Sequence, residues 1–140
     1  LNLPLYHVSG LGIVFRSLLS GASIVSCCET HPVSHLSVVP TQLIRLLREE
    51  KSLPSLKTVF LGGARISQPL VDEALSKGFP LQLTYGMTEM ASSVTVTKAL
   101  VPGQRIHLGS VIPGKEMQLS FEGEILLRGE SLFLGYELED

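Results

Sequence analysis

The sequence predicts an α/β fold in which part of a mostly parallel sheet, flanked by helices, is followed by part of an antiparallel β subdomain. The first 84 residues alternate short apolar runs with amphipathic helical patterns. Short connections between such elements favour a parallel sheet covered by helices. After about residue 92 the helical patterns end and strand alternation begins. We therefore expect an α/β portion over residues 1–92 and a β-rich portion over residues 93–140, joined near residues 85–110.

The α/β portion begins with a predicted helix over residues 9–20, which Gly21 would end. Its apolar residues recur at helical spacing: Leu11, Val14, Phe15, Leu18 and Leu19. Strands are expected at Ala22–Cys27 and Leu36–Val39, because both runs are short and rich in β-branched residues. A second helix is expected over Thr41–Glu50, where the leucines cluster on one side.

A strand over Leu56–Leu61 and a third helix continue the alternation. Ser67 is in the position of an N-cap, with Pro69 in the first turn and Gly78 just past the helix end. The predicted buried stripe of this helix consists of Leu70, Val71, Ala74 and Leu75. A further strand is expected at Leu81–Thr84.

The β-rich portion contains a predicted hairpin. Met117, Leu119 and Phe121 alternate with polar residues, as they do in a half-buried strand. Glu122-Gly123 supplies a tight turn, and Glu124–Arg128 forms the second strand.

The composition excludes several classes of protein. With 44% hydrophobic and 17% charged residues, the chain is not of the disordered class. A net charge of −2 without a basic stripe argues against a nucleic-acid partner, and no apolar stretch approaches the roughly 20 residues of a membrane span. The adjacent Cys27 and Cys28 favour a reducing compartment, so we expect a cytoplasmic protein. The chain starts without Met inside an apparent element, which predicts an internal fragment of a larger protein.

Two segments follow predicted strands and could carry chemistry. In the glycine loop, Leu61–Ala64, two glycines allow a planar or anionic ligand close to the backbone, although a plain turn is the alternative. The segment Thr84–Glu89, termed the 84–89 segment, combines two hydroxyls, an aromatic ring and a carboxylate. Thr88 could donate to a phosphate oxygen and Glu89 could hold Mg²⁺. The alternative is a turn in which Thr88 caps a short helix and Glu89 faces water.

The first predicted helix offers a third set of polar residues. Arg16 lies off the apolar stripe, on the face that carries Ser9 and Gly12. Because Gly12 leaves room one turn before it, the guanidinium could bind a carboxylate through two hydrogen bonds. The alternatives are a solvated Arg16 and, for His7, a hydrogen-bonded structural histidine.

Taken together, these segments resemble the adenylate-forming acyl-CoA synthetase superfamily, in that family's order along nearly the whole chain. The matching motifs are Leu3–Gly10, Phe60–Ala64, Tyr85–Glu89 (Y-G-x-T-E), Gly109–Gly114, Gly123–Gly129 and Gly135-Tyr136. Within the superfamily, His7–Gly10 followed by Arg16, together with Ser37–Leu47, resembles the ligases that join o-succinylbenzoate to coenzyme A in menaquinone biosynthesis.

The resemblance implies a two-step reaction with ATP, Mg²⁺ and a small carboxylic acid. The carboxylate attacks the α-phosphate of ATP to give an acyl-adenylate and pyrophosphate, and the thiol of coenzyme A then displaces AMP. The implied nucleotide-binding residues are Gly62, Gly63, Ala64, Thr84, Tyr85, Gly86, Met87 and Thr88. Thr88 and Glu89 are the implied catalytic residues, Glu89 also being the Mg²⁺ ligand. The implied acid-binding residues are His7, Ser9 and Arg16, with Arg16 facing the carboxylate that is not activated.

The resemblance also implies three elements outside the chain. These are a Ser/Thr/Gly-rich triphosphate loop before Leu1, a Thr-Gly-Asp segment beyond Asp140, and a small C-terminal domain with a catalytic lysine. We therefore expect the segment alone to be inactive and its exposed sheet edges to favour self-association. Two alternatives stay open for the parent protein: another acyl-CoA or fatty-acid ligase, or a non-catalytic binding remnant of the scaffold.

Overall fold

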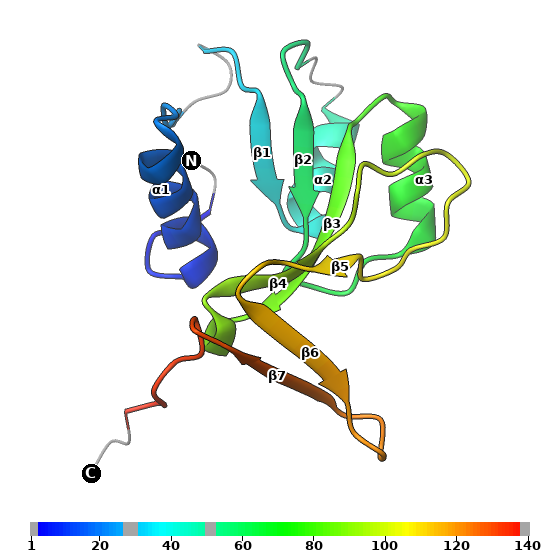
Figure 1. Ribbon diagram of the computed structural model, residues 1–140. Coiled ribbons are helices and arrows are strands. Elements are labelled where there is room, and N and C mark those ends of the chain that lie inside the picture. Colours follow the sequence, from blue (N-terminus) through cyan, green and yellow to red (C-terminus); the bar gives the residue numbers. More distant parts are fainter. Residues whose placement is uncertain (1–2, 27–30, 50–52, 138–140) are drawn as a thin grey trace.

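The computed structural model describes residues 3–26, 31–49 and 53–137. The elements are α1 (Val8–Ser20), β1 (His35–Val38), α2 (Pro40–Arg48), β2 (Thr58–Leu61), α3 (Gln68–Ser76), β3 (Leu81–Met87), the 3₁₀ helix η1 (Thr88–Met90), β4 (Ser92–Val96), β5 (Ser110–Val111), β6 (Lys115–Leu119) and β7 (Ile125–Gly129). Five strands form one sheet in the order β1-β2-β3-β4-β5, and β6 and β7 form a separate hairpin (Figure 1). Strands β1, β2 and β3 are parallel, whereas β4 and β5 are antiparallel, which confirms the predicted fold class.

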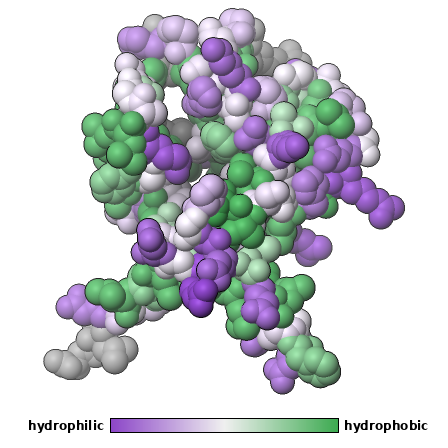
Figure 2. All heavy atoms as spheres, in the orientation of Figure 1, coloured by the Kyte–Doolittle hydropathy of each residue, from purple (hydrophilic) through white to green (hydrophobic). Residues whose placement is uncertain are grey.

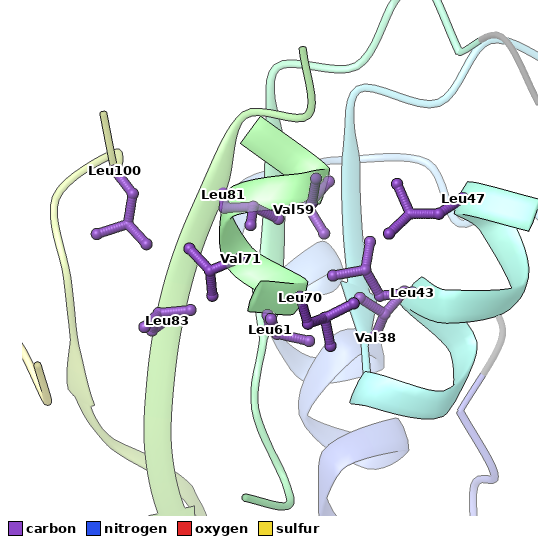
Figure 3. Close-up of a cluster of buried hydrophobic side chains, with 11 residues drawn as sticks. Val38, Leu43, Leu47, Val59, Leu61, Leu70, Val71, Leu81, Leu83 and Leu100 are labelled. Carbon is purple, nitrogen blue, oxygen red and sulfur yellow. The ribbon is translucent and has the colours of Figure 1, made fainter. Parts of the chain in front are cut away.

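The core lies between the parallel strands and helices α2 and α3, which cover the same face of the sheet (Figure 3). Right-handed crossovers between adjacent parallel strands place successive helices on one face in this way. The buried cluster consists of Val38, Leu43, Leu47, Val59, Leu61, Leu70, Val71, Ala74, Leu81, Leu83 and Leu100. Apart from Leu100, all of these residues lie on the elements from β1 to β3.

Helices α2 and α3 are confirmed, although α2 ends at Arg48 and the predicted end at Glu50 lies outside the described residues. In α2, Leu43 and Leu47 are one turn apart and buried, and the Gln42 side chain accepts a hydrogen bond from the Val39 amide at 3.1 Å. In α3, Ser67 occupies the N-cap position, but its side chain makes no capping hydrogen bond. Gly78 follows α3 with φ at +79°, a conformation typical of the residue that ends a helix.

The predicted strand at Ala22–Cys27 is wrong over its described part. Residues 22–26 form no strand, and Ile24 is 43% exposed; Cys27 and Cys28 lie outside the described residues. A β-branched run becomes a strand only when a neighbouring strand satisfies its backbone. Among the described strands, β1 is paired with β2 alone, and no ladder includes residues 22–26.

Strand β3 is longer than predicted. Tyr85, Gly86 and Met87 continue the strand instead of forming a turn, because β4 pairs antiparallel with them. The register shifts between Tyr85 and Gly86, as it does at a β-bulge. The side chain of Thr97, just after β4, accepts a hydrogen bond from the Leu83 amide at 2.9 Å. The 84–89 segment is therefore mostly strand, and only Thr88 and Glu89 belong to η1.

The predicted hairpin is confirmed as β6 paired antiparallel with β7. The predicted turn at Glu122-Gly123 lies within a longer loop, which is closed by a hydrogen bond of 2.8 Å from the Ser120 amide to the Glu124 carbonyl. The hairpin projects from the five-stranded sheet near β4 and β5 (Figure 1).

Helix α1 is confirmed but exposes its apolar stripe. It stands apart from α2 and α3 and contacts β4 (Figure 1). Phe15 is 60% exposed and Leu19 is 89% exposed, and apolar side chains gather over α1 on the surface shown in Figure 2. No helix within the described ranges is both long and apolar enough to cross a bilayer.

Close packing at the end of β2 generates the first prediction. A Cβ added at Gly62 would lie 2.2 Å from the Thr84 hydroxyl oxygen and 2.6 Å from its carbonyl oxygen. Gly62→Ala should therefore lower the free energy of unfolding by about 1–3 kcal/mol, as overpacking does. Urea denaturation of this chain, followed by circular dichroism, measures the change.

Gly12→Ala is the matched control. An added Cβ there would meet only the end of the flexible Arg16 side chain, with Nη1 at 3.0 Å. Alanine in a helix is favoured over glycine by about 1 kcal/mol, so this variant should keep or gain stability. Equal stability of the Gly62→Ala variant and the unmodified chain would contradict the packing argument.

Candidate functional site

The candidate site begins where two neighbouring parallel strands end. The glycine loop follows β2 and η1 follows β3, and the carboxyl ends of parallel strands lie at the same edge of a sheet (Figure 1). Gly62 is buried, and its amide donates to the Val38 carbonyl at 3.2 Å. Its missing side chain allows direct contact with Thr84 of β3. The two predicted nucleotide-binding segments are therefore adjacent.

The outer part of the glycine loop is open to solvent. Gly63 and Ala64 are both exposed, and Gly63 has φ at +78°. A side chain is rarely tolerated at such a φ, and the bare backbone amides there can approach a flat or anionic ligand. The loop therefore bends at Gly63, and its backbone is exposed beside the 84–89 segment.

The backbone bends sharply after η1. Ala91 and Ser92 have φ values of +51° and +86°, which residues other than glycine seldom adopt. Gly86 lies opposite this bend, and an added Cβ there would fall 1.9 Å from the Ser92 carbonyl oxygen. Such backbone conformations persist only where the surroundings hold them, and they cluster at functional sites. Thr88 is exposed at the start of η1, with Met87 as the N-cap.

The Glu89 carboxylate is held by an aromatic hydroxyl. Tyr136 Oη donates a hydrogen bond of 2.5 Å to Glu89 Oε1, and this bond lowers the pKa of Glu89 below its ordinary value. The same bond raises the pKa of Tyr136, because the charged acceptor stabilises the protonated phenol. Glu89 is therefore an anion at neutral pH.

A magnesium site at Glu89 is chemically consistent with this donor set. Mg²⁺ is commonly bound by one or two carboxylates together with the phosphates of a substrate. Among the described residues, no group of three or more His, Cys, Asp or Glu side chains could enclose a metal ion. Glu89 supplies one ionised carboxylate, which is the protein group that such a site uses.

The residues predicted to bind the acid lie on and before α1. His7 is the N-cap: its Nδ1 accepts from the Ser9 amide at 3.2 Å and lies 2.8 Å from the Ser9 hydroxyl. Because Nδ1 accepts from an amide, the neutral ring carries its proton on Nε2. His7 therefore caps α1, and its exposed ring keeps Nε2–H available as a donor.

Arg16 has the predicted arrangement beside Gly12. Its Nη1 lies 3.0 Å from the position that a Gly12 Cβ would occupy, so the guanidinium fills the space that glycine leaves. Arg16 is exposed to solvent; partial desolvation of its guanidinium lowers its pKa, and the group stays protonated at neutral pH. Within the described residues, no carboxylate forms an ion pair with it. Arg16 is thus an exposed cation beside Gly12.

The structure brings several of the predicted residues together. Gly62 contacts Thr84, and η1 and α1 both contact β4. A shallow depression of about 510 Å³ lies elsewhere and contains none of the predicted site residues. It is lined by Ile66, Gln68, Asp72, Gly103, Arg105 and Ile106. Sequence reasoning missed the contact of Tyr136 with Glu89, since the two are 47 residues apart and Gly135-Tyr136 was noted only as a motif.

This chain is similar in sequence to known ligases. The 2-succinylbenzoate–CoA ligase of Escherichia coli K12 is 40% identical across 97% of this chain, which covers 30% of that protein. The ligase of the same name from Haemophilus influenzae is also 40% identical across 97% of the chain, which covers 31% of it. The chain therefore spans less than a third of the length of these curated relatives.

The fold is also similar to that of solved MenE structures. Escherichia coli MenE with a bound m-phenylether-linked analogue of OSB-AMS matches with a TM-score of 0.80 and 39% identity, over 96% of this chain and 30% of that one. Bacillus subtilis MenE in complex with ATP and a magnesium ion matches with a TM-score of 0.82 and 28% identity, over 97% of this chain and 33% of that one. The model of the AMP-binding enzyme family matches residues 1–137. The chain belongs to the AMP-binding enzyme family.

Proposed function

We propose that the protein containing this chain is an ATP-dependent, AMP-forming acid–CoA ligase that converts o-succinylbenzoate to o-succinylbenzoyl-CoA, a step of menaquinone biosynthesis. The observation that carries the proposal is the 40% identity to 2-succinylbenzoate–CoA ligase across 97% of this chain. The adjacency of the glycine loop and the 84–89 segment supports it. The narrower choice of acid rests on α1, where Arg16 supplies a cation.

The glycine loop and the end of β3 form the proposed nucleotide side of the site. Gly62, Gly63 and Ala64 line the adenine, and Tyr85 lies beside it. Thr84, Gly86 and Met87 complete the nucleotide-binding strand, which is paired with β4. Thr88, exposed at the start of η1, donates its hydroxyl proton to an α-phosphate oxygen.

Glu89 is the proposed ligand of Mg²⁺. When bound, the ion neutralises the charge that develops on the phosphate oxygens during transfer. The protein contributes fixed donors and a carboxylate that is already ionised, so little reorganisation accompanies the reaction. The attacking groups are the substrate carboxylate and then the thiol of coenzyme A, so no protein nucleophile is required.

The acid side of the proposed site consists of His7, Ser9 and Arg16. o-Succinylbenzoate has two carboxylates, and only one of them becomes the acyl-adenylate. Arg16 binds the other, because a charge that stays on the substrate needs a partner when it leaves water. His7, whose ring is fixed by Ser9, borders the pocket with its Nε2–H.

A substrate panel tests the function in the full-length protein. ATP–pyrophosphate exchange should be fastest with o-succinylbenzoate, measured as kcat/KM for the acid. Two comparison acids test the acid specificity. 4-oxo-4-phenylbutanoate keeps the succinyl carboxylate of o-succinylbenzoate but lacks the carboxylate on the ring, and octanoate represents the fatty acids. If octanoate were the better substrate, the parent protein would be a different acyl-CoA ligase. Nucleotide binding without exchange on any acid would indicate a binding remnant.

Arg16→Ala tests the acid side. The variant should raise KM for o-succinylbenzoate about tenfold or more, since a hydrogen bond to a charged group contributes about 1.5–3 kcal/mol. In this test Arg16 is assigned to the carboxylate on the ring. KM for ATP and KM for 4-oxo-4-phenylbutanoate should then stay unchanged, because neither molecule has that carboxylate. Arg48→Ala, a matched removal of an exposed arginine from α2, serves as the control. An unchanged KM for o-succinylbenzoate would remove Arg16 from the pocket.

A further inference from the structure

The segment after β7 makes three hydrogen bonds to two consecutive residues of η1. The Phe133 amide donates to the Glu89 carbonyl at 2.8 Å, and Ser131 Oγ donates to the Met90 carbonyl at 3.2 Å. Tyr136 Oη donates to the Glu89 carboxylate at 2.5 Å. Backbone and side chain of Glu89 are therefore both held by residues from more than 40 positions later in the chain.

The Tyr136 ring is itself held. It packs edge-to-face on Phe133, with ring centroids 4.8 Å apart and an interplanar angle of 79°. Such aromatic pairs favour one relative orientation. Phe133 is half-buried and is anchored to Glu89 through its amide, so it fixes the position from which Tyr136 reaches the carboxylate.

Lys115 of β6 contacts the backbone on both sides of the bend at Ala91 and Ser92. Its ammonium donates to the carbonyl of Met90 and, at 2.6 Å, to that of Ser93. These two carbonyls flank Ala91 and Ser92, the pair with positive φ. A half-buried cation that bridges them stabilises the bend through which η1 joins β4.

We propose that Tyr136 is a positioning residue for Glu89: its hydroxyl fixes one carboxylate oxygen, so that the lone pairs that remain face the Mg²⁺ of bound Mg·ATP in one orientation. A carboxylate has about four lone-pair sites, so one hydrogen bond leaves acceptor capacity for a cation. Lys115 acts on the same turn through the backbone. This inference rests on the proposed function, in which Glu89 is the metal ligand.

Metal binding without turnover tests the proposal in the full-length protein. Mn²⁺ replaces Mg²⁺, and its binding in the presence of ATP is followed by water-proton relaxation, with the acid and coenzyme A omitted. Tyr136→Phe removes only the hydroxyl and keeps the ring packed edge-to-face on Phe133. The variant should weaken Mn²⁺ binding about tenfold, in line with the loss of a hydrogen bond to a metal ligand. The Mg²⁺ activation constant should rise in parallel, while KM for the acid stays unchanged.

Glu116→Gln is the matched control on the hairpin. It disrupts an exposed pair, in which Arg128 Nη2 lies 2.8 Å from Glu116 Oε2, without touching η1. Its Mn²⁺ binding should equal that of the unmodified protein. An equal loss in this variant would reveal a general effect of the hairpin and overturn the specific role of Tyr136.

Glu89→Gln separates failure of this inference from failure of the proposed function. If Glu89→Gln loses Mn²⁺ and Tyr136→Phe binds it as tightly as the unmodified protein or more tightly, the positioning role is wrong and the metal role of Glu89 stands. If Glu89→Gln retains full Mn²⁺ binding, Glu89 is no metal ligand, and both the inference and that part of the proposed function are overturned.

Discussion

Strand β3 is hydrogen-bonded along both edges, and the placement of the site depends on this pairing. Residues Leu81–Leu83 pair with the parallel strand β2, and residues Thr84–Met87 pair with the antiparallel strand β4. A shift of β3 along its axis would break two ladders with different hydrogen-bond patterns at once. The point at which β3 gives way to η1 is thereby fixed, and with it the position of Thr88 and Glu89. The glycine loop is tied to the same strand, because Gly62 has no side chain to separate it from Thr84.

Most elements could be predicted because their patterns are local. The helical spacing of leucines predicted α1 and α2, and alternation predicted the β6–β7 hairpin, since each periodicity is a property of neighbouring residues. Ala22–Cys27 has the composition of a strand, yet residues 22–26 form no strand, because composition alone does not determine which backbone segments pair into a ladder. The extension of β3 through Tyr85–Met87 was missed for the same reason. Its partner β4 lies beyond a bend, at Ala91 and Ser92, whose residue types give no signal of positive φ.

The candidate site was partly predictable for a topological reason. Loops after parallel strands meet at one sheet edge, so the glycine loop and the 84–89 segment could be placed together from their order alone. Arg16 beside Gly12 followed from helical spacing, and the structure has it there. The capping role of His7 was open, since a histidine before a helix gives no indication of which nitrogen accepts a hydrogen bond. The contact of Tyr136 with Glu89 could not be predicted, because a contact between residues 47 positions apart leaves no local sequence pattern.

The hydrogen bonds to η1 from later residues also have a consequence for local unfolding. Lys115, Ser131, Phe133 and Tyr136 all donate to the turn between β3 and β4, and all belong to the hairpin or to the segment that follows it. Detachment of the hairpin would leave the carbonyls of Glu89 and Met90 without these donors. In terms of native-state hydrogen exchange, we expect the turn and the hairpin to open as one cooperative unit, and the Phe133 amide to exchange only when that unit opens. The position of the Glu89 carboxylate is therefore only as persistent as the docking of a hairpin distant in sequence.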